Sequence, residues 1–157
     1  MSVAGTAQGL GSYILFSVAA TTYALPSREV RHMEMIEGTT RVPNAPAFID
    51  GVVFSRGQVV PVVNLRARFG FDRAEFDLRT RLIVVQAGER LIGLVADSAR
   101  EFVTIPPDAI QPPNDALTGM SGRYVDGIAS MGDRLVLVLS LDRIVNFAEA
   151  GTVGLAE

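Results

Sequence analysis

The sequence predicts an all-β protein made of two packed five-stranded β-barrels and closed by a short C-terminal helix. Three observations lead to this prediction. Short runs of β-branched and aromatic residues alternate with turns that contain glycine and proline along most of the chain. Helical periodicity is confined to residues 141–147 and to a single turn at residues 66–69. The two halves of the chain also repeat each other, which indicates a duplicated module.

The first half of the chain contains three strand segments. Residues 13–18 and 21–26 are rich in apolar and β-branched residues and predict a hairpin. Residues 58–65 predict a further strand, which contains Pro61. Because proline cannot donate a hydrogen bond to a strand ladder, Pro61 is expected at a sheet edge or at a bulge.

The second half contains a hairpin, a buried strand and a helix. Residues 82–86 and 91–97, joined by a glycine-containing turn, predict the hairpin. Residues 134–139 form a nearly continuous apolar run, which predicts a strand covered on both faces. Residues 141–147 carry apolar side chains at helical spacing, with an acidic residue near the start, and predict a short closing helix.

An internal repeat relates the two halves. Residues 51–69 align without a gap with residues 127–145, at an offset of 76 positions that sets Gly51 over Gly127. Upstream segments repeat at a slightly shorter offset. A duplicated β module predicts two small barrels with thin cores, which are expected to pack together and to leave a binding groove between them.

These patterns predict one domain over residues 13–148. Its first lobe is expected at about residues 13–72 and its second at about residues 80–148, and an exchange of strands between the lobes is compatible with the repeat. Residues 1–12 and 149–157 are expected to be flexible tails.

The composition of the chain limits the classes of partner that it is expected to bind. The chain has 157 residues, of which 48% are hydrophobic and 20% charged, as in a globular protein. A net charge of −3 gives no overall basic character, so nucleic acid is not an expected partner. No apolar run approaches the ~20 residues of a membrane helix, and the first twelve residues lack the Lys or Arg of a secretory signal. Direct membrane insertion is therefore not expected.

Motifs for catalysis or metal binding are missing. The chain has no cysteine and a single histidine, His32, so a zinc site is not expected. Asp72, Glu75 and Asp77 lack the spacing of a calcium-binding loop and are interpreted as a solvated linker. No G-x-S-x-G motif and no phosphate-binding glycine loop occurs. The sequence predicts no enzymatic activity and no cofactor.

A series of segments resembles the CheW family of chemotaxis coupling proteins over roughly residues 13–148, in order and without large insertions. The stretch from Val42 to Gly70 is the most specific part. The segments that carry the resemblance are residues 13–18, 23–26, 40–49, 51–52, 56–63, 65–70, 83–85, 93–97, 112–113 and 124–127.

The resemblance implies two SH3-like β-barrels with a hydrophobic groove between them. It implies a non-catalytic adaptor that couples methyl-accepting chemoreceptors to a CheA-type histidine kinase. The partners would be the regulatory domain of that kinase and the cytoplasmic tip of the receptors. The adaptor would be cytoplasmic, recruited to membrane-associated receptor arrays, and monomeric or weakly self-associating when alone.

The resemblance also implies positions for two binding faces. The receptor-binding groove would include Val30, Gly51, Arg56, Gly57, Ile92, Ala99 and Phe102. The kinase-binding residues would be Thr40, Arg41, Val42, Gln111 and Ala116. An amphipathic helix tip needs apolar floor residues and small residues for close approach. The planar guanidinium of Arg56 suits carbonyl and carboxylate groups at the rim.

Two departures from the family pattern leave alternatives open. Phe54-Ser55 precedes Arg56-Gly57 where the family usually has Asn-Leu, and His32 stands where an acidic residue is common. A charge change beside the groove alters which partner is preferred. An adaptor of a type IV pilus or other chemosensory-like pathway is therefore one alternative. A two-lobed barrel that binds a small apolar ligand and an enzyme of unrecognised type are the others.

Overall fold

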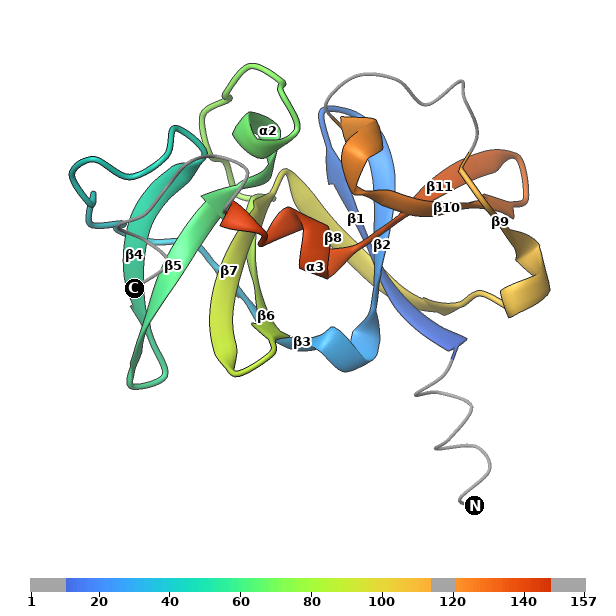
Figure 1. The fold of residues 1–157 in the computed structure, drawn as a ribbon, viewed down its shortest axis with the longest axis horizontal. Helices are drawn as coiled ribbons and strands as arrows, with labels where there is room; N and C mark the ends of the chain where they lie inside the picture. Colours follow the sequence, from blue (N-terminus) through green and yellow to red (C-terminus); the bar gives the residue numbers. More distant parts are fainter. Residues whose placement is uncertain (1–10, 114–120, 148–157) are drawn as a thin grey trace.

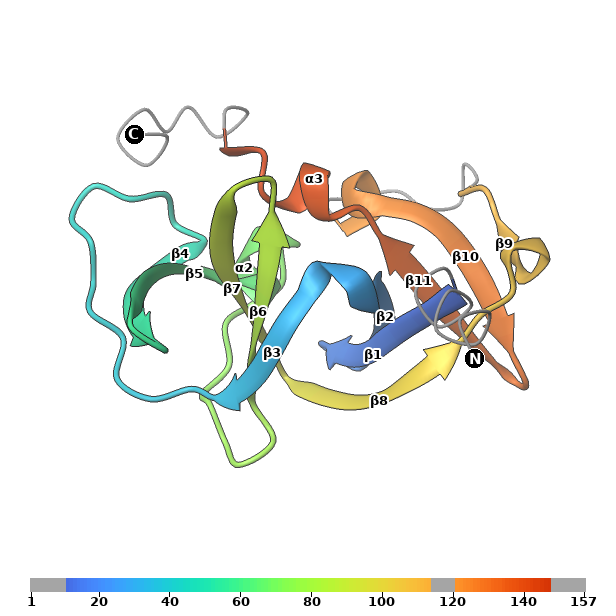
Figure 2. The same ribbon diagram turned by 90° about the horizontal axis from the view of Figure 1, so that it is seen from below.

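The computed structural model describes residues 11–113 and 121–147, and all structural statements below concern these residues. The chain forms two strongly curved β-sheets that lie side by side, with a few short helical segments around them (Figures 1 and 2). This architecture confirms the prediction of an all-β fold with two barrels.

The two sheets are unequal in size. The five-stranded sheet has the order β3-β6-β7-β5-β4 and consists of β3 (Val30–Met35), β4 (Ile49–Ser55), β5 (Gln58–Asn64), β6 (Arg81–Ala87) and β7 (Arg90–Ala96). The six-stranded sheet has the order β8-β1-β2-β11-β10-β9 and consists of β1 (Ser12–Val18), β2 (Thr21–Pro26), β8 (Ser98–Thr104), β9 (Ile110–Gln111), β10 (Val125–Met131) and β11 (Arg134–Leu139). The expectation of five strands in each barrel is corrected by the two-residue strand β9.

Short helical segments connect the strands. Two are α-helical, α2 (Leu65–Arg68) and α3 (Leu141–Ile144), and three are 3₁₀ turns, η1 (Ser27–Glu29), η2 (Pro107–Ala109) and η3 (Ser121–Tyr124). The predicted single turn and the predicted closing helix are both present, the latter shorter than expected. Asn64 and Ser140 cap them by accepting the backbone N–H of Ala67 at 3.2 Å and of Arg143 at 3.3 Å.

The two repeated halves of the chain form matching elements, but each half places its first hairpin in the sheet of the other half. The unit β4-β5-α2 recurs as β10-β11-α3. However, the β1–β2 hairpin pairs with β8 and β11, and the β6–β7 hairpin pairs with β3 and β5. One sheet therefore spans residues 30–96, and the other combines residues 12–26 with 98–139. The expected lobe division near residues 72–80 does not follow the boundary between the sheets, because each half completes its sheet with the hairpin of the other.

A common core joins the sheets. The largest buried cluster takes residues from both of them. Its centre is a row of aromatic rings in which neighbouring centroids lie 6.1, 5.2 and 5.4 Å apart, formed by Phe16, Tyr23, Phe69 and Tyr124. Rings at these separations add attraction to the free energy of burial. The two sheets thus form one packed unit.

A polar contact fixes the crossover between the sheets. Asp97 lies between β7 and β8, where the chain leaves one sheet for the other. Its carboxylate accepts two hydrogen bonds from the Arg66 guanidinium, at 2.9 and 2.8 Å, and one from the backbone N–H of Ala19 at 2.8 Å. Because Arg66 belongs to α2 and Ala19 to the β1–β2 turn, this carboxylate links elements of both sheets.

Pro61 lies inside the sheet, which corrects the expectation of an edge or a bulge. It belongs to β5, which has β7 and β4 as neighbours. Its cross-strand partner Val52 directs its N–H and C=O toward Thr40 instead. The parallel ladder with β7 begins only at Val62. The sheet therefore loses no hydrogen bond at the proline nitrogen.

Candidate protein-binding faces

Two surface depressions on the five-stranded lobe contain four of the candidate residues, Val30 and Arg56 in one and Arg41 and Val42 in the other. The first, called here the arginine depression, has a volume of about 410 Å³ and is lined by Arg28, Val30, Arg31, His32, Ser55, Arg56, Gln58 and Leu91. It lies where β3 meets the tips of the β4–β5 and β6–β7 hairpins. Val30 and Leu91 provide half-buried apolar floor, and the three arginines are exposed.

The shape of β3 explains how consecutive residues reach the same depression. The pairing with β6 shifts between Val30 and His32, so Arg31 is the extra residue of a β-bulge. A bulge breaks the strict alternation of side chains along a strand. Val30, Arg31 and His32 can therefore line one depression together.

The two departures from the family pattern touch each other. His32 Nε2 lies 2.7 Å from Glu34 Oε2 and 3.2 Å from Ser55 Oγ, and the Ser55 hydroxyl donates a 2.6 Å hydrogen bond to the same Glu34 oxygen. The hydrogen bond from Ser55, and after it the one from His32, hold the pKa of Glu34 below its usual range. His32 and Ser55 thus form one polar cluster with Glu34.

The structure brings together only part of the predicted receptor groove. Val30 and Arg56 line the arginine depression, and Gly57 follows Arg56 in the hairpin turn. Ile92 is 0% exposed within the common core and lines neither depression, whereas its neighbour Leu91 lines the arginine depression.

The remaining predicted groove residues lie elsewhere. Gly51 is buried, and a Cβ atom there would lie 2.0 Å from the carbonyl oxygen of Thr40, so it permits a close backbone approach. Ala99 and Phe102 lie on β8 of the six-stranded sheet. Ala99 is half-buried against the core, whereas Phe102 is 59% exposed.

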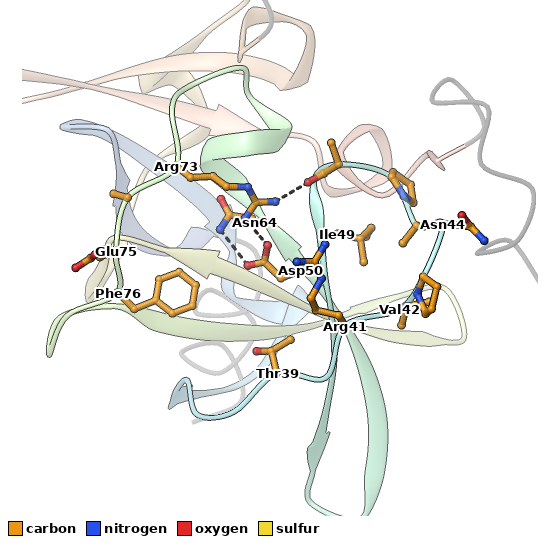
Figure 3. A pocket seen from close by; sticks show the side chains of 15 residues that line it. Thr39, Arg41, Val42, Asn44, Ile49, Asp50, Asn64, Arg73, Glu75 and Phe76 are labelled. Carbon is orange, nitrogen blue, oxygen red and sulfur yellow. Dashed lines mark hydrogen bonds and ion pairs between the residues drawn. The ribbon is translucent and has the colours of Figure 1, made fainter.

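The second depression, called here the loop groove, has a volume of about 1040 Å³ (Figure 3). One wall is formed by the segment between β3 and β4, from Thr39 onward, together with Ile49 and Asp50 at the start of β4. The other is the segment that follows α2, from Arg73 to Phe76. Arg73 binds the Asp50 carboxylate and the carbonyl oxygen of Ala47, which ties the two walls together.

The loop groove contains two of the predicted kinase-binding residues. Arg41 and Val42 line it (Figure 3), and Thr40 beside them exchanges backbone hydrogen bonds of 2.9 and 2.8 Å with Val52. Gln111 is exposed on β9, in the other sheet. Ala116 lies outside the described residues.

Sequence reasoning missed residues in both depressions. Arg28 and Arg31 were not singled out, because a chain of net negative charge gives no signal for a local cluster of arginines. The segment with Arg73 and Phe76 was interpreted as linker, although it forms a wall of the loop groove. The opposite charges of Arg73 and Asp50 are the one sequence signal that could have indicated that this segment forms a wall.

The described part of the chain also bears on metal binding and membrane spanning. It contains no group of three or more His, Asp or Glu side chains arranged to hold a metal ion. Asp77 instead accepts a 2.8 Å hydrogen bond from the backbone N–H of Arg79, which lowers its pKa. No helix in residues 11–113 or 121–147 is long and apolar enough to cross a membrane.

Glu29 provides a stability prediction. Burial raises its pKa, and its Oε1 atom has no hydrogen-bond partner. The folded state thus binds this proton more tightly than the unfolded chain, so this group's contribution to stability falls as the pH rises through the raised pKa. We expect Glu29→Gln to raise the Tm by about 1–3 °C at pH 7 and to leave it unchanged near pH ~3.5, where the unfolded carboxyl is protonated as well. Calorimetric scans with the exposed Glu89→Gln as control test this, and a lower Tm for Glu29→Gln at pH 7 would contradict it.

The fold and these faces define a double β-barrel protein with open surface depressions, and comparison with known proteins gives its family. A family model described as "CheW-like domain" matches residues 12–149. The chemotaxis protein CheW of Klebsiella aerogenes is 25% identical over 141 residues, covering 90% of this chain and 85% of that protein. CheW of Rhizobium meliloti is 30% identical over 131 residues, covering 83% and 84%.

A solved structure is similar as well. The crystal structure of the scaffolding protein TtCheW from Thermoanaerobacter tengcongensis superposes with a TM-score of 0.80 at 28% identity, covering 87% of this chain and 92% of that one. The chain belongs to the CheW-like family. Members of this family are non-catalytic scaffold adaptors, which confirms the prediction that the chain is not an enzyme.

Proposed function

We propose that the chain couples methyl-accepting chemoreceptors to a CheA-type histidine kinase. The observation that carries this proposal is the separation of the two depressions, since no residue lines both. An adaptor that holds two partners at once needs two faces that do not compete. The relatives named chemotaxis proteins support the same function.

In this proposal the arginine depression binds the receptor tip, and the loop groove binds the regulatory domain of the kinase. Val30 and Arg56 belong to the first face, and Arg41 and Val42 belong to the second. The hydrogen bonds of Arg73 join the two walls of the loop groove, and the common core supports the strands beneath both faces. The two faces are thereby held in a fixed relation. The adaptor would act in the cytoplasm, recruited to receptor arrays at the membrane.

The test is calorimetric titration with the kinase regulatory domain and, separately, with the receptor cytoplasmic fragment from the same genome. We expect Val42→Asp to weaken kinase binding by at least about tenfold, because it places an unpaired charge at the interface, and to spare receptor binding. We expect Arg56→Glu to show the reverse pattern.

Each variant is the control for the other, and both positions are solvent-accessible, so neither substitution should unfold the chain. If the wild type fails to bind any such kinase domain, the coupling function is wrong. If both variants weaken both partners equally, the assignment of two separate faces is wrong.

A further inference from the structure

The lining of the arginine depression carries an excess of positive charge. Arg28, Arg31 and Arg56 line it, and no carboxylate lines it with them. Among the described residues, none of these three guanidinium groups lies within ion-pair distance of an acidic side chain. Glu29 attracts Arg28 and Glu34 attracts Arg56 without a direct ion pair. Arg28 also borders a second depression that Asp126 and Asp142 line. Arg31 has no such acidic neighbour among these residues.

Two acidic side chains lie close to the arginine depression, and each is hydrogen-bonded within the protein or partly buried. The Glu34 carboxylate already accepts hydrogen bonds from Ser55 and His32. Glu29 is half-buried, with one carboxylate oxygen fully enclosed. The arginines are therefore left available for a carboxylate supplied by another molecule.

Irregular backbone geometry presents two of these arginines, and at Arg56 it carries a conformational cost. Arg31 is the extra residue of the β3 bulge, and Arg56 has a φ angle of +50°, followed by Gly57 at +85°. A two-residue hairpin turn with two positive φ angles strongly favours Asn-Gly, and arginine is a poor choice for its first position. Non-glycine residues with positive φ angles are enriched at binding sites, although Ala19 and Ala20 adopt similar angles in the β1–β2 turn.

We propose that the arginine depression binds a carboxylate-rich segment of the chemoreceptor, with Arg28 and Arg31 acting beside Arg56 as specificity-determining cations. This inference rests on the proposed function and names the chemistry of the partner at that face. A guanidinium group binds a carboxylate through two parallel hydrogen bonds, and the apolar floor of Val30 and Leu91 accepts the adjacent aliphatic groups. His32, where the family commonly has an acid, removes a charge that would repel such a segment.

The first experiment measures receptor affinity at several salt concentrations for the whole chain. We expect Arg28→Gln/Arg31→Gln to bind the receptor cytoplasmic fragment at least about tenfold more weakly and with a flatter salt dependence, while binding the kinase domain as the wild type does. Arg79→Gln, an exposed arginine outside the depression, is the matched control and should change neither affinity.

A second variant separates recognition from folding. Arg56→Asn suits the turn better than arginine does, so we expect a Tm equal to or above that of the wild type together with weaker receptor binding. Receptor affinity and salt dependence unchanged in the double variant would overturn this inference and leave the proposed function standing. Absence of receptor binding by the wild type would overturn both.

A third measurement addresses other anionic partners. Sedimentation with vesicles containing one-third phosphatidylglycerol should recover no protein. Vesicle binding that disappears in Arg28→Gln/Arg31→Gln would show that the arginines recognise lipid, and would overturn the assignment to an acidic protein segment.

Discussion

Arg68→Met should lower the free energy of unfolding by about 2–4 kcal/mol, because Arg68 binds the C-terminal end of α3 to the core. The side chain is only 4% exposed. Its Nε donates to the carbonyl oxygen of Ile144 at 2.9 Å, and its Nη2 donates to that of Asn146 at 3.0 Å. The guanidinium carbon also lies 4.2 Å from the centre of the Phe48 ring. Methionine fills part of the volume but removes the donor from the carbonyl group of the buried Ile144.

Urea denaturation measures this change, and Arg79→Met is the control. Arg79 is exposed on the linker between α2 and β6, so its replacement should change the free energy of unfolding by less than about 0.5 kcal/mol. A loss below about 1 kcal/mol for Arg68→Met would contradict the assigned role. The same experiment tests the contact between the two repeated units, since Arg68 ends α2 and binds the end of its repeat counterpart α3.

The sequence predicted six of the eleven strands, β1, β2, β5, β6, β7 and β11, but not the sheet that each of them joins. Local patterns of β-branched residues and turns indicate where β1, β2, β6 and β7 begin and end. They carry no information on long-range partners, and the parallel pairings of β5 with β7 and of β11 with β2 come from the three-dimensional packing of both halves. The repeat correctly indicated that α2 and α3 are equivalent, because it was read from aligned positions rather than from local propensity.

The binding faces were predictable to a smaller extent. The family pattern indicated Arg56 and Val42, which line surface depressions, and Ile92, which lies in the core. Successive side chains of a strand face opposite sides, so a shift of one position exchanges a surface residue, Leu91, for a core residue. The position of Arg31 in the arginine depression depends on the β-bulge in β3, and no feature of the local sequence predicted that bulge.

Gly51→Ala should disrupt the proposed kinase-binding face, although Gly51 itself lies in the interior. Its φ angle is +139°, and an added Cβ would lie 2.0 Å from the Thr40 carbonyl oxygen, closer than any stable contact. That oxygen accepts the Val52 N–H at 2.8 Å, which anchors the wall of the loop groove on β4. Moving this wall displaces Arg41 and Val42 together.

We expect Gly51→Ala to lose about 2–4 kcal/mol of stability, from the strained backbone and the displaced segment. Under conditions where the variant remains folded by circular dichroism, affinity for the kinase regulatory domain should fall at least about tenfold. Receptor binding should persist, because Gly51 does not line the arginine depression.

Gly57→Ala is the matched control for this variant. Gly57 also has a positive φ angle, +85°, but no atom lies within 4 Å of the position that a Cβ would occupy. The control therefore measures conformational strain alone, which should amount to about 1 kcal/mol, with kinase affinity unchanged. If the two variants lose equal stability and both retain kinase binding, the contact between Gly51 and Thr40 does not hold the kinase face. A larger loss for Gly51→Ala in both measurements would show that the repeat's buried glycine shapes the binding surface through the backbone it supports.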